Sequence, residues 1–377
     1  MATTALLAAL LIVIAGCAPN PVPPTTLVIA SATPVAQTPA PSSSLATVDA
    51  ASVELHYLDA RYVPADAPVS ADGQLLWTAG ENGPSEIWRY VPGAAEPERL
   101  FASPRQDGAI TAVAGSRAGY AFAEESPRAF GEGGWRLWFL AAPGREPVEI
   151  DRGSAPGAGV APTLAMDGEH VAWAAFDEPP AGPVSRLRLA AIASLPAVST
   201  LIEAPIAERK LWYPALSGQE LWYATIEPDP AGVRDEFHIE HLDLAEPQAP
   251  ATVFRGPGHD FNPAVNARFV VWKTTDPGDA ALNWGALRLL DRGTDAVRTI
   301  PVARANRPSI GDRFIAFDEV THARLEVYDL ATRRVVELGR SESAPAYGGI
   351  SLSGSLLAFF TQDGGGQPRI GWAVLPG

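Results

Sequence analysis

Hydrophobic side chains along most of this chain alternate with polar ones in short runs, and Gly, Pro or Asp residues separate the runs. In Ser52–Leu58 and Arg186–Ala190, for example, every second side chain is apolar. A period of two is the pattern of a β-strand that buries one face and exposes the other. No long segment shows the period of 3.6 residues that an amphipathic helix requires. The pattern therefore predicts an all-β protein built from short antiparallel strands.

These strands belong to copies of one repeated unit. Each copy has a short apolar strand, often opened by Pro, then a Gly or Asp turn, then an apolar strand with an aromatic side chain. The aromatic residues of the seven copies are Trp77, Tyr120, Trp173, Trp222, Trp272, Phe317 and Phe359, and successive ones lie 43, 53, 49, 50, 45 and 42 positions apart. One or two further alternating strands follow each aromatic residue. Four-stranded units of this length, repeated six to eight times, predict a β-propeller. We expect seven blades, with six or eight as the alternatives.

The two ends of the repeat region complement each other. The last copy supplies only three strands, over Ile350–Leu352, Ser355–Thr361 and Pro368–Leu375. The segment Ser52–Leu58 precedes the first copy and has no partner within it. We therefore expect this N-terminal strand to complete the last blade and close the ring, which would leave no open sheet edge.

Two of the copies contain a Pro-to-Asp-Gly motif, in Pro68–Gly73 and in Pro162–Gly168. This motif resembles the Pro-x-aromatic-Ser-Pro-Asp-Gly repeat of TolB-like and WD-type bacterial propellers. The resemblance covers nearly all of the repeat region and implies the propeller architecture. A fold of this kind serves many functions, so the resemblance leaves the partner open.

The first residues carry a different pattern. An apolar run over Ala5–Ala15 ends in small residues before Cys17, which is the single cysteine of the chain. The run is shorter than the roughly 20 residues that a transmembrane helix requires. Ile14–Cys17 resembles the lipobox of bacterial lipoprotein signal peptides, which implies cleavage before Cys17 and a lipid on its thiol. Ordinary cleaved secretion and a cytosolic protein are the alternatives.

Composition divides the chain into three parts. Residues 1–17 are the expected signal peptide with its lipidated cysteine, and residues 18–48 are rich in Pro, Ala, Ser and Thr and carry no charge. Such a tract is typical of a disordered tether. Residues 49–377 hold every charged side chain and the whole formal charge of −15, and we expect them to form the propeller. An acidic domain does not favour binding to nucleic acid.

The chain offers few catalytic or metal-binding motifs. It lacks the Gly-x-Ser-x-Gly nucleophile elbow and any dinucleotide motif. His238 and His241 are three residues apart, which places them on opposite faces of a strand. The acidic loops Glu227–Asp235 and Asp276–Asp279 lack the ligand spacing of a calcium loop. We therefore predict no catalytic residues, no metal and no cofactor, and we favour a binding protein over an enzyme.

The candidate site follows from propeller geometry, because the loops that enter the innermost strands converge on one mouth of the central channel. The residues that these loops bring there are Tyr213, His259, Asp260, Asn262, Arg304, Arg307 and Tyr347. Function commonly resides on such loops. We expect a monomeric, lipid-anchored, extracytoplasmic propeller that binds a protein or cell-envelope ligand. The alternative is a glycan-active hydrolase or lyase, which would need paired carboxylates about 5–10 Å apart at this mouth.

Overall fold

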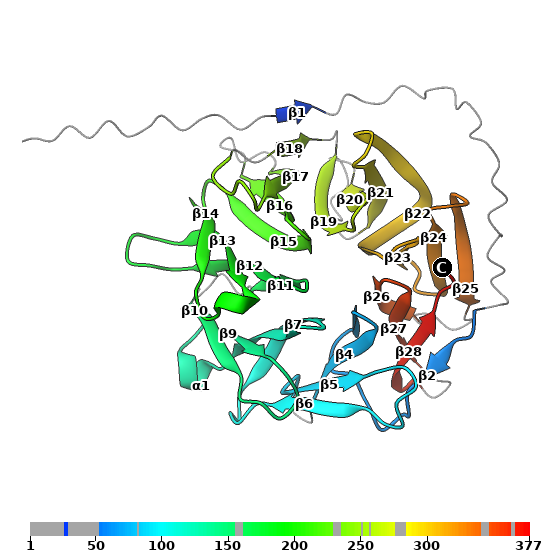
Figure 1. The fold of residues 1–377 in the computed structure, drawn as a ribbon, viewed down its shortest axis with the longest axis horizontal. Helices are drawn as coiled ribbons and strands as arrows, with labels where there is room; N and C mark the ends of the chain where they lie inside the picture. Colours follow the sequence, from blue (N-terminus) through cyan, green and yellow to red (C-terminus); the bar gives the residue numbers. More distant parts are fainter. Residues whose placement is uncertain are drawn as a thin grey trace, which may run out of the picture.

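A computed structural model describes residues 26–28, 53–80, 83–154, 161–228, 235–249, 252–255, 258–275, 284–340, 347–362 and 366–377. Within these residues almost all regular structure is β, and the sheets stand around a central opening (Figure 1). The two helical segments are short, α1 (Pro127–Phe130) and η2 (Ile192–Ser194). The predicted all-β propeller is confirmed.

The first three sheets each contain four consecutive antiparallel strands. The first contains β3 (Val69–Ala71), β4 (Gln74–Ala79), β5 (Glu86–Tyr90) and β6 (Glu98–Ala102). The second contains β7 (Ala109–Ser116), β8 (Gly119–Glu125), β9 (Gly134–Leu140) and β10 (Val148–Ser154). The third contains β11 (Thr163–Met166), β12 (His170–Asp177), β13 (Val184–Ala191) and β14 (Ser199–Pro205).

The fourth sheet has an additional edge strand. It contains β15 (Lys210–Ser217), β16 (Glu220–Glu227), β17 (Glu236–Asp243) and β18 (Thr252–Arg255), and β1 (Thr26–Val28) pairs in parallel with β18. Apart from β1, the expected signal peptide with Cys17 and the tether 18–48 lie outside the described residues. Among the described residues, no helix has the length and hydrophobicity needed to cross a bilayer.

The next seven strands form one continuous sheet. They are β19 (His259–Val265), β20 (Phe269–Thr275), β21 (Gly285–Asp291), β22 (Ala296–Ile310), β23 (Phe314–Glu319), β24 (Arg324–Asp329) and β25 (Arg334–Arg340). The first half of β22 pairs with β21 and its second half with β23. The described strands therefore form six hydrogen-bonded sheets, or seven four-stranded units when both halves of this sheet are counted.

The last sheet joins the two ends of the propeller. It contains β26 (Tyr347–Ser353), β27 (Leu356–Gln362), β28 (Pro368–Val374) and, at its edge, the N-terminal β2 (His56–Tyr57). His56 pairs with Trp372 and stacks on its ring at 4.1 Å, and the N–H of Leu58 donates to the carbonyl of Ile370 at 2.9 Å. The expected closure by the N-terminal strand is confirmed.

The repeated aromatic side chains are all buried and pack between neighbouring sheets. Six of the seven face the preceding four-stranded unit in the ring. Trp173, for example, lies in one hydrophobic cluster with Trp135 and Leu137 of the second sheet. Trp77 likewise packs with Ile370 of the last sheet, so the same contact also joins the first and last sheets.

Trp222 is the exception, and its predicted equivalence to the other six is wrong by one residue. Trp222 clusters with Val270 and Trp272 of the following sheet. Its neighbour Tyr223 packs with Leu187 of the preceding sheet and so occupies the repeated position. Adjacent residues of a strand point to opposite faces, and the repeat pattern alone cannot choose between two adjacent aromatics.

Candidate functional site

A bulge recurs in three of the strands next to the central opening, and each bulge includes a residue that precedes Pro. These residues are Tyr213 in β15, Asn262 in β19 and Arg307 in β22, with left-handed φ angles of 49°, 55° and 46°. This conformation costs a non-glycine residue roughly 1–2 kcal/mol. The following Pro is buried each time, while Tyr213 and Arg307 are exposed and Asn262 is half-buried. The bulges therefore bury the Pro in the core and direct the preceding side chain toward solvent.

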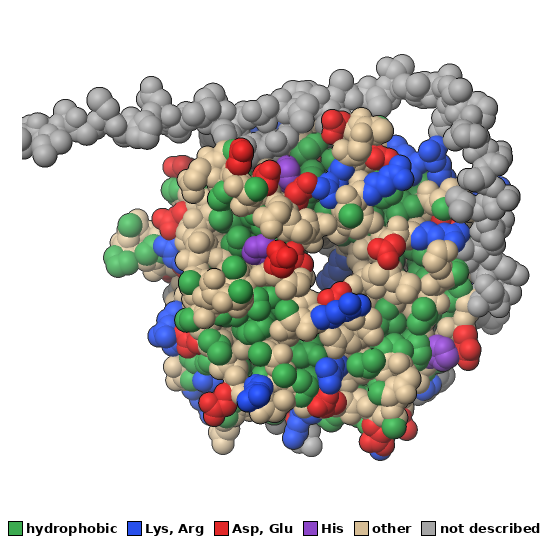
Figure 2. Space-filling model, in the orientation of Figure 1, with side chains coloured by type: hydrophobic (Ala, Val, Ile, Leu, Met, Phe, Trp, Pro, Cys, Tyr) green, Lys and Arg blue, Asp and Glu red, His purple; other side chains and the backbone are tan. Residues whose placement is uncertain are grey.

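Tyr213 and Arg307 are close enough to influence each other electrostatically. Burial raises the pKa of the Tyr213 phenol, and the positive charge of Arg307 acts in the opposite direction. The backbone N–H of Tyr213 donates to Oγ1 of Thr163 at 3.1 Å, which ties this bulge to β11. In the space-filling view, basic and acidic side chains border the opening at the centre of the ring (Figure 2).

A buried lysine lies behind these bulges. Lys273 in β20 is 2% exposed, and its Nζ donates to Oδ1 of Asn306 at 2.8 Å and lies 3.9 Å from the ring centre of Phe261. Nδ2 of Asn262 also donates to Oδ1 of Asn306, at 3.5 Å. Burial, and secondarily the charge of Arg307, lowers the pKa of Lys273 to about 7. The site thus combines an exposed guanidinium, two amides and an amine that titrates near neutrality.

The other four predicted residues lie on inner strands but outside these bulges. His259 and Asp260 are buried at the start of β19 and do not present their side chains to solvent, contrary to the expectation of open loop residues. Arg304 is exposed on β22. Tyr347 is half-buried on β26, and its N–H donates to the carbonyl of His322 at 2.8 Å. The structure therefore places Tyr213, Asn262 and Arg307 at equivalent bulges, and the other four predicted residues lie outside these bulges.

Sequence reasoning missed the buried charged residues Lys273 and Asp318. The backbone N–H of Ile350 donates to Oδ1 of Asp318 at 3.0 Å, and burial raises the pKa of this carboxyl. Lys273 directly follows Trp272, and Asp318 directly follows Phe317. A charged residue immediately after the repeated aromatic was the available signal, but it lies in strands that the pattern assigns to the core.

A separate cavity of about 1040 Å³ lies beside β4 and β5. Its lining includes Tyr62, Trp77, Trp88, Arg105 and Asp107. The two tryptophan rings stack with their centres 6.4 Å apart. The volume suits a small molecule, and the lining combines aromatic surface with charged groups. It does not include the residues of the inner-strand bulges, so it is a second potential binding surface.

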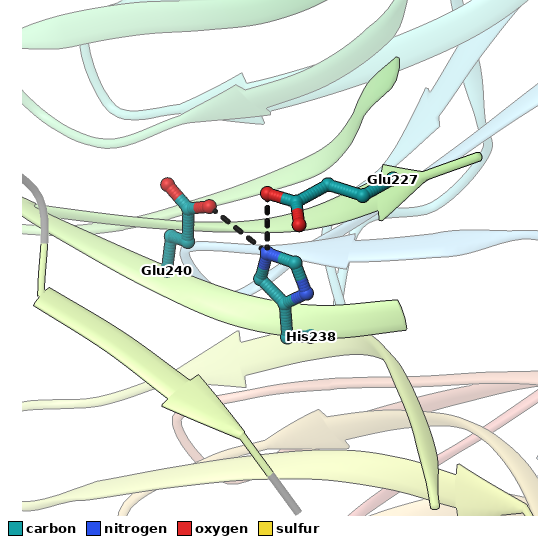
Figure 3. Close-up of side chains that lie close together, drawn as sticks. All are labelled: Glu227, His238 and Glu240. Carbon is teal, nitrogen blue, oxygen red and sulfur yellow. Dashed lines mark ion pairs between the residues drawn. The ribbon is translucent and has the colours of Figure 1, made fainter. Parts of the chain in front are cut away.

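Among the described residues, one group of side chains could hold a metal ion: Glu227, His238 and Glu240 (Figure 3). Their potential ligand atoms all lie within 4.8 Å of one another. His238 and Glu240 are almost fully buried, whereas the Glu227 side chain is 37% exposed. His241 lies on the opposite face of β17, as expected, where it stacks on Trp222.

Comparison with known proteins supports the architecture. No model of a known protein family matches the chain, and no curated protein matches it in sequence. A prolyl endopeptidase structure aligns with a TM-score of 0.58 and 14% identity over 81% of this chain, and this chain spans 46% of that one. The propeller domain of the Trilobed protease from Pyrococcus furiosus gives 0.57 and 8% identity over 84% of this chain and 93% of that chain. An oligogalacturonate lyase from Vibrio parahaemolyticus gives 0.52 and 11% identity over 86% and 97%.

These identities show a shared fold and nothing finer. The chain is a β-propeller protein whose similar structures include peptidases and a lyase.

Proposed function

We propose that this protein is a lipid-anchored, extracytoplasmic propeller that binds a carboxylate-bearing ligand at the mouth formed by Tyr213, Asn262 and Arg307. The observation that supports this most is the recurrence of the strained pre-proline bulge at three inner strands. Each bulge directs a different polar or aromatic side chain outward on a rigid framework. Strain of this kind persists where the surrounding structure imposes it, and it commonly accompanies binding sites.

The chemistry of the mouth favours a carboxylate. The Arg307 guanidinium can donate two parallel hydrogen bonds to a carboxylate, and the amides of Asn262 and Asn306 add neutral polar groups beside it. Lys273 adds a second positive charge when it is protonated. The chain as a whole carries a net charge of −15, so the Arg307 guanidinium would be the group at this mouth that binds an anion.

The expected location depends on Cys17. The lipobox resemblance supports cleavage and lipidation at this residue, and the uncharged residues between Cys17 and β1 would connect the lipid to the propeller. The partners in this proposal are therefore the membrane, through the lipid, and a protein or cell-envelope ligand with an exposed carboxylate.

Replacement of Arg307 tests the binding site. Arg307→Asn removes the guanidinium but keeps a residue type that tolerates left-handed φ. Arg333→Asn is the matched control, because Arg333 is also exposed and has a φ of 58° but belongs to the β24–β25 turn. Calorimetric titration would use oligogalacturonate and an acidic peptide, each compared with its methyl ester.

We expect wild type and the Arg333 variant to bind one carboxylate probe, and Arg307→Asn to bind it at least about tenfold more weakly. Binding of the saccharide or of the peptide would identify the class of ligand. Equal affinity of the Arg307 variant, or equal affinity for esterified probes, would reject this site.

A glycan-active lyase or hydrolase is the second candidate. The observation in its favour is Lys273, because an amine whose pKa is about 7 can accept a proton at neutral pH. The described side chains at the three bulges are aromatic, amide and cationic, whereas a glycoside hydrolase uses paired acids. Release of unsaturated oligogalacturonate by wild type, lost in Lys273→Met, would favour the lyase over the binding protein.

A further inference from the structure

We propose that Glu227, His238 and Glu240 bind a divalent transition-metal ion of the zinc type, at a site separate from the channel mouth. The three side chains come from the adjacent strands β16 and β17 (Figure 3). The sequence analysis predicted no metal, because it paired His238 with His241 and not with the acidic residues on the same face of the sheet.

The strand register places the ligands on one face of the fourth sheet. Thr225 pairs with His238, Tyr223 with Glu240, and Glu227 with Glu236. These alternate residues share a face, and Tyr223 of this face packs against the third sheet. His238 and Glu240 are each about 1% exposed, whereas Glu227 reaches solvent. An ion could therefore enter past Glu227 and bind at the buried pair.

The distances from His238 to the two carboxylates match those between ligands of a tetrahedral site. Nε2 of His238 lies 3.2 Å from Oε1 of Glu240 and 3.5 Å from Oε1 of Glu227. Zinc–nitrogen and zinc–oxygen bonds of about 2.0–2.1 Å put neighbouring ligand atoms roughly 3.3–3.4 Å apart in a tetrahedron. At these separations Nε2 forms ion pairs with both carboxylates, which Figure 3 marks with dashed lines. A metal ion between the three atoms would take the place of these direct pairs.

In both glutamates, neighbouring side chains bind one carboxylate oxygen and leave the other directed toward His238. The hydroxyl of Tyr223 donates to Oε2 of Glu240 at 2.6 Å, and Arg209 pairs with the same oxygen. Oε2 of Glu227 pairs with Nη2 of Arg255 at 3.2 Å. Hydrogen bonds to the outer oxygen are the usual way in which proteins orient metal-binding carboxylates. In both glutamates this leaves Oε1 as the oxygen nearest His238.

Unsatisfied buried polar atoms are a second, independent observation. Nδ1 of His238 and Oγ1 of the paired Thr225 are both buried, and neither has a hydrogen-bond partner among the described residues. Buried polar atoms in native proteins are almost always satisfied, and a cluster of exceptions points to a missing ion or water. A hydrated metal ion at Nε2 would bring water close to these atoms.

Three protein ligands leave a fourth position for water or another small ligand. In zinc proteins, three protein ligands with one open position is the pattern of sites that bind or activate a molecule, whereas structural sites have four protein ligands. Mixed nitrogen and oxygen ligands suit zinc and its neighbours better than calcium, which prefers oxygen alone.

Metal titration of the full chain tests this site. The protein is stripped with a chelator, titrated with Zn²⁺ by calorimetry, and titrated in parallel with Co²⁺, whose visible absorption reports tetrahedral coordination. We expect one ion per chain and a higher melting temperature with Zn²⁺, because binding to the folded state alone stabilises it. Glu227→Gln and His238→Gln remove ligands, and His241→Gln is the control on the opposite face of the same strand.

Loss of an outer partner typically weakens metal affinity about 10–100-fold, so loss of a ligand should weaken it at least as much. The Co²⁺ absorption should disappear in Glu227→Gln and remain in His241→Gln. Because Glu227 is partly exposed, this variant decides the question even if His238→Gln fails to fold. No Co²⁺ absorption in wild type, or unchanged affinity in folded Glu227→Gln, would overturn the proposal and leave a network of ion pairs.

Discussion

Lys273 shows how one buried charge couples stability to pH. Burial and Arg307 lower the pKa of Lys273 in the folded protein to about 7, well below its ordinary value of 10.5. Between these two pH values the unfolded chain binds more protons than the folded protein. Stability should therefore rise with pH across this window, and the cost of the buried charge is largest below about pH 7. Lys273→Met should flatten this dependence, measured as melting temperature from about pH 7 to about pH 10.

The other lysine of the chain supplies the control. Lys210 lies at the start of β15, and Lys210→Met should keep the wild-type slope. Parallel curves for wild type and Lys273→Met would mean that Lys273 is not buried as the structure describes. The comparison is between variants because other groups titrate in the same range and contribute to every curve.

At the level of residues, the sequence located the positions of the inner-strand bulges but not the charged groups behind them. Tyr213, Asn262 and Arg307 could be found because each precedes a Pro that begins a repeat. Their left-handed backbone conformation could not be predicted, because the residue before Pro is usually extended. Lys273 and Glu240 lie within alternating strands, where the pattern indicates burial but not which other strand supplies their partners.

At the level of elements, closure of the ring depends on a short N-terminal strand. Leu58 is buried, His56 stacks on Trp372, and Arg369 donates to the carbonyl of Leu58 at 3.1 Å. A chain of residues 61–377 loses this strand and exposes the edge of β28. We expect it to be at least about 3 kcal/mol less stable in denaturant than residues 49–377, from the apolar burial and hydrogen bonds of this segment.

The longer chain is the matched control for this deletion. Compared with the full chain, residues 49–377 lack the expected signal peptide and the tether, which includes the three-residue β1 at the outer edge of the fourth sheet, so they should melt close to the full chain. Hydrogen exchange should show faster exchange over β26–β28 in the shorter chain. Equal denaturation midpoints for the two truncated chains would contradict a role of β2 in closure.

The sequence also predicted which strands form. It did not predict where one four-stranded unit ends and the next begins, or which of two adjacent aromatic residues faces the preceding unit. Period-two alternation and the spacing of aromatics located the strands and the closing segment. The fifteen-residue β22 (Ala296–Ile310) continues from one four-stranded unit into the next, although Pro301 and Pro308 within it indicate breaks between strands. Tyr223 replaces Trp222 at the repeated position because two adjacent aromatics are equally compatible with the pattern.

At the level of the whole molecule, the charged residues and the N-terminal apolar run lie in different parts of the chain. Residues 1–48 are uncharged and contain the apolar run before Cys17, whereas residues 49–377 carry the net charge of −15. Acidic surfaces are repelled by anionic lipid head groups, so the propeller itself does not provide electrostatic attraction to a membrane. Attachment would depend on the lipid, whose acyl chains contribute about 0.8 kcal/mol for each buried CH₂ group.

Replacement of Cys17 tests this division of roles. Because the proposed anchor is hydrophobic, wild-type protein should stay in the membrane fraction through a wash with about 1 M salt, which screens charge attraction, and should be released by detergent. Cys17→Ser removes the thiol that would carry the lipid and should move the protein to the soluble fraction, as measured by fractionation of the expressing cells. Ala18→Ser is the control, since it changes the adjacent residue and keeps the cysteine. If Cys17→Ser remains in the salt-washed membranes as wild type does, the thiol is not the point of attachment.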